Sequence, residues 1–375
     1  MRVPELVVIA EQLLAPVPGG TGRYTAELLR ALADTVPQGW RLSSAVARHG
    51  DVESARITGV EGPRVLPLPP RALAAAWQAG VPLWPGGQAV HAPTPLAPPR
   101  ARGGRTLAVT VHDTVPWTHP ETLTPRGVSW HRSMIARAAD RADTLVVPTR
   151  AVADELARLV EARAEIRVVG HGATEALTQR HETPGPEAPA PDLPSRFVLA
   201  VGTVEPRKGI DVLIRAVAGL ADDVALVLAG QPGWGGLDPV ALAREHGLPA
   251  HRLHVLGRIG DAQLAHVLRA AAVLAAPSLA EGFGLPVLEA MACGVPVVHS
   301  DAPALVEVAG GAGMTTVRGD VRSLENALAE VLRSPARAAE LAAAGRARAT
   351  AFSWTRAARQ VWSIHQFAGS GTSAG

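Results

Sequence analysis

Short apolar runs alternate with amphipathic segments along the chain. In the first half, LVVIA (6–10), LAVTVHD (107–113) and TLVVPT (144–149) are apolar runs without strict polar alternation. Such runs are typical of strands that are buried on both faces of a parallel sheet. Between them, TGRYTAELLRALADTV (21–36) repeats its large apolar residues at helical spacing. The pattern therefore predicts an α/β domain in which helices cover both faces of parallel strands.

The same pattern restarts after a proline-rich segment, ETPGPEAPAPDLPSR (182–196), which we interpret as a linker because proline removes amide donors and favours extended chain. Beyond it we predict a helix at about 210–220 and strands at 197–204, 224–230, 253–259, 273–278 and 295–301. We therefore expect Rossmann-like domains over 1–181 and 197–353, and a helix with a flexible tail over 354–375 that packs on the first domain. In two doubly wound domains, the ligand is expected between them, at the carboxyl ends of the strands.

Composition excludes several classes of protein. The formal charge of +2 over 375 residues is near balance, which argues against a nucleic-acid partner bound through broad electrostatics. Cys293 is the only cysteine, so no intrachain disulfide is possible and a reducing compartment such as the cytoplasm fits best. The apolar run near the start is too short for a signal peptide or for the roughly 20 residues of a membrane span.

The segment VLAAPSLAEGFGLPVLEAMACGVPVV (273–298) carries the most chemistry. We predict that a strand ends near Ser278, that a glycine-rich turn follows, and that Pro286 opens a helix. Such a turn brings backbone close to a ligand and presents the amide groups of a helix N-terminus, which favours an anion. Glu281 and Glu289 are eight positions apart and suggest that the ligand also carries hydroxyls, although both could merely cap or solvate the helix start.

The string EGFGLPVLEAMACGVPVV closely resembles the signature of family 4 glycosyltransferases, which are retaining enzymes of the GT-B fold with a deep cleft between two Rossmann-like domains. By this resemblance, Glu281 contacts hydroxyls of the donor sugar and has a catalytic role, while Glu289 binds the ribose. The residues of the turn that the resemblance places at the donor are Gly282, Phe283, Gly284 and Leu285.

A second matching segment is GTVEPRKGIDVLIRAV (202–217), which resembles the family's diphosphate-binding strand, loop and helix. Lys208 is the only lysine in the chain. Arg207 offers a bidentate fork for phosphate oxygens and Lys208 a compact ammonium, so we predict that both act on the donor diphosphate, beside Gly202 and Thr203. The alternative is a solvated pair at a helix start, where the helix dipole disfavours cations.

Two N-terminal segments also match the family. PVPGGTGRYTAELL (16–29) resembles the loop that packs over the diphosphate, and by that match Gly20 and Gly22 are donor-binding, although a plain turn would look the same. TVHDTVPWTHPE (110–121) resembles the family's His-Asp segment, which makes His112 a catalytic candidate near the transferred sugar and Asp113 a donor contact. Without that context, a His-Asp pair is more often structural.

The chain departs from the family pattern at VVGHGAT (168–174), where His171 replaces the expected asparagine. Arg258, in LGRI (256–259), is a candidate for contact with the nucleobase. No Asp-x-Asp motif or metal-ligand spacing is present, so we expect no metal and no cofactor, with the leaving diphosphate neutralised by Arg207, Lys208 and a helix N-terminus.

The resemblance implies a retaining hexosyltransferase of the mannosyltransferase type, with GDP-mannose as the expected donor and UDP-glucose or UDP-N-acetylglucosamine as the alternative. The acceptor is expected to be a cell-surface glycan or glycolipid. RGVSWHRSMIARAADR (126–141) could rest on the inner face of the membrane, although an ordinary packed helix fits as well. A non-catalytic sugar-nucleotide binder could keep the fold, and an oxidoreductase or epimerase would need a dinucleotide fingerprint that is missing.

Overall fold

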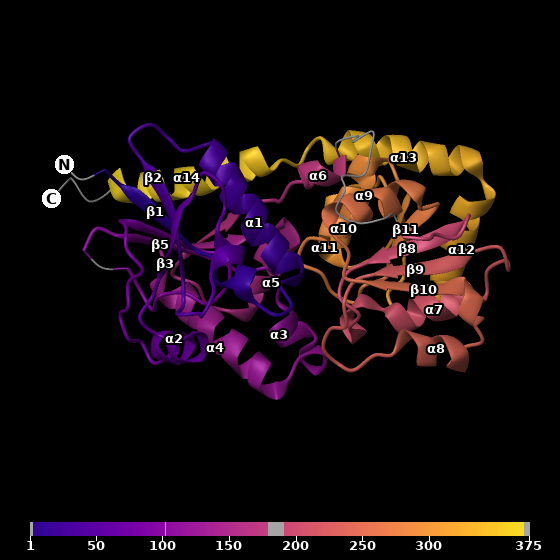
Figure 1. Ribbon diagram of the computed structural model, residues 1–375, viewed down its shortest axis with the longest axis horizontal. Coiled ribbons are helices and arrows are strands. Elements are labelled where there is room, and N and C mark those ends of the chain that lie inside the picture. Colours follow the sequence, from indigo (N-terminus) through magenta and orange to yellow (C-terminus); the bar gives the residue numbers. More distant parts are fainter. Residues whose placement is uncertain (1–2, 102, 179–190, 371–375) are drawn as a thin grey trace. The chain divides into compact units, whose positions relative to one another are not determined.

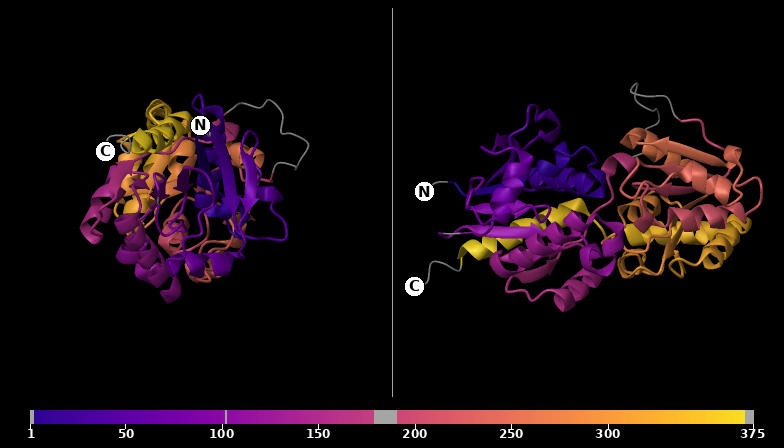
Figure 2. Two further views of the ribbon diagram at one scale, coloured as in Figure 1. Left: turned by 90° about the vertical axis from the view of Figure 1, so that its left-hand side faces the viewer. Right: turned by 90° about the horizontal axis from the view of Figure 1, so that it is seen from below.

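The computed structural model describes residues 3–101, 103–178 and 191–370, and Figure 1 and Figure 2 show its ribbon. By their internal contacts the residues divide into two compact units. Unit 1 comprises Met1–Pro120, Thr124–His171 and Ser353–Gly375, and unit 2 comprises Glu121–Leu123 and Gly172–Phe352. Each unit is built around one parallel sheet, as the run of buried apolar segments predicts.

The sheet of unit 1 has seven parallel strands in the order β3-β2-β1-β4-β5-β6-β7. The strands are β1 (Glu5–Ile9), β2 (Arg41–Val46), β3 (Glu61–Val65), β4 (Ala89–Ala92), β5 (Thr106–Thr110), β6 (Thr144–Val147) and β7 (Glu165–Val168). The helices include α1 (Gly19–Asp34), α2 (Pro70–Gln78), α3 (Val115–Thr118), α4 (Pro125–Arg141), α5 (Arg150–Leu159) and α14 (Trp354–Ser370). Strand β5 ends at Thr110, earlier than predicted, so the His112-Asp113 pair lies in the loop that follows.

The sheet of unit 2 has six parallel strands in the order β10-β9-β8-β11-β12-β13. The strands are β8 (Phe197–Val201), β9 (Ala225–Ala229), β10 (Leu253–Gly257), β11 (Val273–Ala276), β12 (Val297–Ser300) and β13 (Met314–Thr316). The helices are α6 (Glu175–Thr178), α7 (Ile210–Ala218), α8 (Pro239–Glu245), α9 (Asp261–Ala270), α10 (Leu285–Cys293), α11 (Pro303–Ala309), α12 (Val321–Arg333) and α13 (Pro335–Ala349). The strand order reverses between β8 and β11, as it does between β1 and β4 in unit 1.

The boundary between the units lies after His171, whereas the sequence suggested residue 181. The residues just beyond it bond within unit 2: the Thr174 hydroxyl donates to Glu289 (3.3 Å), and the Leu177 carbonyl accepts from Arg269 (2.9 Å). Residues 179–190, which include most of the predicted linker, lie outside the described part of the chain. The remaining linker residues, 191–196, form no helix or strand.

Helix α14 at the end of the chain packs on α1 and β5 of unit 1 (Figures 1 and 2). Its Trp362 is buried, donates through Nε1 to the Leu32 carbonyl (3.3 Å), and meets Trp40 edge to face (5.7 Å between ring centroids). Burial of a tryptophan side chain with its N–H satisfied gives a large hydrophobic contribution without an unpaired donor. The last helix is therefore part of the core of unit 1.

Candidate functional site

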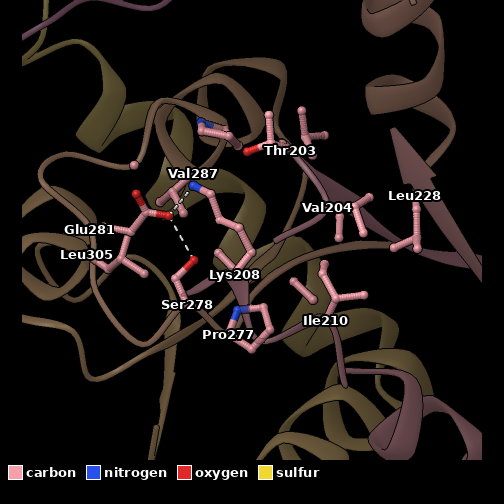
Figure 3. A pocket seen from close by; sticks show the side chains of 17 residues that line it. Thr203, Val204, Lys208, Ile210, Leu228, Pro277, Ser278, Glu281, Val287 and Leu305 are labelled. Carbon is pink, nitrogen blue, oxygen red and sulfur yellow. Dashed lines mark hydrogen bonds and ion pairs between the residues drawn. The ribbon is translucent and has the colours of Figure 1, made fainter. Parts of the chain in front are cut away.

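A small cavity lies at the reversal point of the sheet in unit 2, where doubly wound sheets bind their ligands (Figure 3). Its walls come from the ends of β8 and β11, the start of α7 and the start of α10. Most of the lining residues are apolar, and Lys208, Ser278 and Glu281 converge on one another among them. A mixed lining of this kind is typical of small-molecule sites, in which a few polar groups orient the ligand.

A left-handed glycine sets the position of Lys208 at this cavity. Gly209 has φ of +65°, and a Cβ at this residue would lie 2.5 Å from the carbonyl oxygen of Pro277. Only glycine allows both the backbone angle and the close approach. The tight turn before α7 therefore lies against the end of β11, and Leu279 N donates to the Arg207 carbonyl at 2.8 Å. This packing aims Lys208 at the loop that carries Glu281.

Glu281 is the centre of a cluster of charged side chains. Lys208 Nζ lies 2.5 Å from its Oε1, and the Ser278 hydroxyl donates to the same oxygen at 2.8 Å (Figure 3). Arg207 Nη1 reaches the other carboxylate oxygen at 3.2 Å and also donates to the Ala280 carbonyl at 2.7 Å. The second Arg207 nitrogen, Nη2, binds Glu205 Oε1 at 2.6 Å.

The electrostatics of this cluster keep Glu281 ionised. Burial by itself raises the pKa of this carboxyl, but the charges of Lys208 and Arg207 and the hydrogen bonds from Lys208 and Ser278 outweigh burial and lower the pKa from 4.5 to about 2. The two carboxylates and two cations of the cluster formally cancel. The site therefore offers an ammonium to an anion and a carboxylate to hydroxyl groups within one small cavity.

The predicted donor residues divide by position. Lys208, Glu281, Gly202, Thr203 and Gly284 line the cavity. Arg207 contacts the Glu281 carboxylate, Glu205 and the Ala280 carbonyl. Its position indicates that it holds the carboxylate, a role that the sequence pattern did not predict.

The other predicted donor residues of unit 2 lie in the glycine-rich turn before α10, within α10, or after β10. Glu289 is buried in α10 and accepts from Thr174, while Arg258 is exposed just after β10. Gly282, Phe283 and Leu285 of the turn are buried, as Gly284 is, and Phe283 meets Phe352 edge to face at 5.6 Å. Sequence reasoning missed Ser278, whose only signal was its place at the end of a predicted strand.

His112, in unit 1, has a defined tautomer. Its Nε2 lies 2.8 Å from the Pro93 carbonyl, which can only accept, so Nε2 carries the proton and the neutral ring keeps Nδ1 as an acceptor. Burial lowers the pKa of His112 despite this bond and the nearby Asp113, so the neutral form is favoured. Asp113 accepts from Val115 N at 3.1 Å through Oδ1. This pair therefore has both a structural hydrogen bond and acceptor capacity for a ligand.

Aromatic rings surround His112. Tyr24 meets it edge to face at 4.7 Å, and His171 lies 4.7 Å from Tyr24 and stacks on Trp354 at 5.4 Å. His171 is buried, and burial lowers its pKa well below 6.5. His171, which stands where the family pattern has asparagine, is therefore a neutral packing residue.

The glycines at the start of α1 have different roles. Gly22 is buried, and a Cβ there would collide with Pro18, so the first turn of the helix requires glycine. Gly20 is exposed with open space around it, which leaves room for a ligand but shows no structural demand for glycine.

Helix α4 packs as an ordinary amphipathic helix. Met134 is buried, Arg132 donates to the Pro116 carbonyl (2.8 Å), and Arg137 donates to the Gln78 carbonyl (2.6 Å). These contacts occupy much of the proposed lipid-facing surface within unit 1. Among the described residues, no helix combines the length and apolar character that crossing a membrane requires, and no cluster of three metal-ligating side chains occurs.

Comparison with known families matches both halves of the chain. Residues 18–177 match the family described as Glycosyltransferase Family 4, and residues 186–348 match Glycosyl transferases group 1. The second match covers the whole cavity described above, and the first covers the His112 segment.

Similar curated proteins carry glycosyltransferase names. O-antigen chain mannosyltransferase B of Escherichia coli is 36% identical over 169 residues, which are 44% of each chain. A D-inositol 3-phosphate glycosyltransferase of Gordonia bronchialis is 37% identical over 237 residues, or 58% of this chain and 51% of that protein. Phosphatidyl-myo-inositol mannosyltransferase of Mycobacterium leprae is 34% identical over 168 residues, or 43% and 44% of the two chains. The chain thus spans about half the length of these relatives.

Solved structures share the fold over nearly the whole chain. Sucrose-phosphate synthase from Thermosynechococcus elongatus superimposes with a TM-score of 0.78 at 23% identity and covers 98% of this chain and 100% of its own. HepE of Anabaena, in complex with UDP and glucose, gives a TM-score of 0.73 at 20% identity, with 97% and 100% covered. Identities this low carry the fold alone, and the predicted class of two doubly wound α/β units is confirmed.

Proposed function

Because the chain belongs to the family 4 glycosyltransferases of the GT-B fold, we propose that it transfers a hexose from a nucleotide sugar to a glycan or glycolipid, with mannose from GDP-mannose as the first candidate. The transfer retains the anomeric configuration and proceeds without a metal ion. The protein acts in the cytoplasm, on acceptors made at the inner membrane face.

The observation that carries the proposal is the pairing of Lys208 with Glu281 at the reversal point of the sheet in unit 2. An ammonium carries three donors, of which Glu281 occupies one, so the others can bind phosphate oxygens. Glu281 is ionised and offers lone pairs to sugar hydroxyls. A ligand with both a diphosphate and a sugar satisfies both groups at once.

The chemistry then follows from charge. As the bond between sugar and diphosphate breaks, negative charge grows on the leaving oxygen, and a cation held in a low-dielectric cavity stabilises that charge more than bulk water does. Lys208 supplies this cation, and the N-terminus of α10 adds its positive dipole end. Arg207 donates to the second carboxylate oxygen of Glu281 and helps to keep the carboxylate ionised and oriented.

The names of relatives support mannose as the sugar, since two of them are mannosyltransferases. The inositol-phosphate and phosphatidylinositol names leave a phosphorylated acceptor as one candidate, and the O-antigen name leaves a glycan chain as another. UDP-glucose is the alternative donor, and HepE structures hold UDP or UDP-glucose in the same fold.

A thermal-shift panel tests the donor assignment. GDP, UDP, ADP, GDP-mannose and common UDP-sugars are compared, each with and without EDTA, because a ligand that binds only the folded state raises the melting temperature. The expected result is selective stabilisation by GDP species that EDTA does not change. Stabilisation by UDP species would change the assigned donor from GDP-mannose to a UDP-sugar. Loss of binding in EDTA would refute metal independence. No stabilisation by any nucleotide would refute the transferase proposal.

A further inference from the structure

A second cavity, of about 290 Å³, lies in unit 1 at the point where the order of that sheet reverses. Its walls come from the segments that follow β1, β4 and β5 and from the middle of α4. This is the position at which a doubly wound sheet binds a ligand, and the volume is close to the lower end of small-molecule sites, about 300 Å³. The cavity therefore has room for about one sugar ring.

The cavity presents hydrogen-bonding groups that the fold uses only in part. Gln12 donates through Nε2 to the Pro18 carbonyl (3.1 Å), and Thr94 accepts from Leu96 N (3.2 Å), which leaves the threonine proton to donate. Asp113 uses Oδ1 for Val115 N, so Oδ2 can accept. These groups provide both donors and acceptors for the hydroxyls of a polyol.

The imidazole of His131 adds an acceptor. Its Nδ1 lies 2.8 Å from the Gly127 carbonyl one turn earlier in α4, so Nδ1 carries a proton, and in this tautomer Nε2 is an acceptor. His112 also lines the cavity, so two of its histidines have a ring nitrogen bonded to a backbone carbonyl. Such preset acceptors suit hydroxyl protons.

Trp130 supplies an apolar surface among these polar groups. It lies on α4, half-buried, and meets His131 edge to face at 4.8 Å, which fixes the plane of the indole. An aromatic body with polar groups around it matches a sugar ring, which has apolar C–H faces and a rim of hydroxyls.

The charges of the lining argue against an anionic ligand. No arginine or lysine is among the described residues that line the cavity, whereas Glu11 and Asp113 are. Glu11 is held by Ala47 N and by His49 Nε2, both at 2.7 Å. Arg132 of α4 donates to the Pro116 carbonyl. A phosphate in this cavity would face carboxylates without a cation to offset its charge.

From these observations we infer that the cavity of unit 1 binds the accepting end of a neutral, hydroxyl-rich sugar, with Trp130 as the stacking surface and Gln12, Thr94, Asp113 and His131 as hydroxyl partners. The inference rests on the proposed function and narrows it, because it excludes a phosphorylated polyol at the acceptor position. Trp130, His131 and Gln12 are specificity residues that the sequence motifs did not indicate.

The test compares neutral and phosphorylated members of matched pairs as acceptors: methyl α-mannoside against mannose 6-phosphate, and myo-inositol against myo-inositol phosphate. Release of nucleoside diphosphate is followed at saturating donor for the wild-type protein, Trp130→Ala and Trp130→Phe. Trp234→Ala is the matched control, since it removes an exposed indole from unit 2. We expect the neutral members to stimulate release, and Trp130→Ala to raise the acceptor KM roughly tenfold, with partial recovery in Trp130→Phe.

Stimulation by the phosphorylated members alone would overturn the inference and leave the transferase proposal intact. So would an acceptor KM that is the same in Trp130→Ala and Trp234→Ala. If no nucleotide binds, the proposed function fails. Saturation-transfer NMR with methyl α-mannoside then tests sugar binding in the cavity of unit 1 independently of turnover. A signal that is lost in Trp130→Ala upholds the neutral-sugar site, and the absence of any signal in the wild-type protein overturns it.

Discussion

Replacement of Lys208 by alanine is the perturbation that tests the site in unit 2 most directly. The ammonium lies 2.5 Å from Glu281 and lines the cavity, so its removal affects the donor and the carboxylate at once. The loss of one charge-assisted hydrogen bond to the diphosphate is worth roughly 1.5 to 3 kcal/mol. We therefore expect kcat/KM for the donor to fall by about one to two decades.

The same variant also changes the stability of the protein without ligand. The pKa of Glu281 is about 2 instead of 4.5, which corresponds to about 3 kcal/mol of stabilisation at neutral pH. Because the folded pKa is depressed, this contribution is present above pH 4.5 and is lost as the pH falls toward 2. Lys208 and Arg207 both lower this pKa, so Lys208→Ala should remove part of this stabilisation at pH 7.

The assay combines initial rates at subsaturating donor with urea unfolding, and Arg215→Ala serves as control because it removes the same charge from an exposed position of α7. A double-mutant cycle with Glu281→Gln separates the two effects. If Lys208 acts only by holding Glu281, its removal has no further effect on rate in the Glu281→Gln background. Unchanged turnover in Lys208→Ala, with the control also unchanged, would refute the role assigned to the lysine.

Two further predictions concern the fold around the sites. Gly209→Ala should destabilise unit 2 by more than Gly236→Ala in thermal unfolding, because both residues have positive φ (+65° and +63°) but only Gly209 faces the Pro277 carbonyl. The left-handed backbone alone costs an alanine about 1 to 2 kcal/mol. Equal losses of stability in the two variants would contradict the packing argument. Burial lowers the pKa of His91 from 6.5 to about 3. The free energy of unfolding should therefore be unaffected by His91 above pH 6.5 and should fall below it by about 1.4 kcal/mol per pH unit, because the unfolded chain binds the proton first. Urea unfolding between pH 7 and pH 5 measures this dependence, and a flat profile would contradict the burial of His91.

Much of the fold could be predicted from the hydrophobic pattern. The runs at 6–10, 197–204 and 224–230 coincide with buried strands because a strand covered on both faces contains almost only apolar residues. Strands β2 and β3 were missed, since RLSSAV and EGPRV carry polar residues. Ser43 in β2 is nevertheless buried, because its hydroxyl donates to Glu5 across the sheet (2.8 Å), a partner that no local window contains.

The sequence identified most residues of the candidate site but not how they are arranged. The motifs indicated Lys208, Glu281 and Arg207, but sequence spacing did not indicate that the two cations bind the two oxygens of the Glu281 carboxylate. This arrangement depends on the Pro277 carbonyl against Gly209, a contact between segments about 70 residues apart. The sequence did predict an anion site beside carboxylates, because the residue types themselves limit the chemistry.

The sequence by itself determined the class of fold, the position of the glycine-rich turns and the choice of charged groups, since these follow from local periodicity, backbone freedom and side-chain chemistry. Only the tertiary structure decided which groups meet. It joined Gln12, Thr94, Asp113 and Trp130 in one cavity and fixed the proton on His112 through the Pro93 carbonyl. Parallel strands that are distant in sequence end at the same edge of a sheet, so the residues of a site converge only after every crossover has been packed.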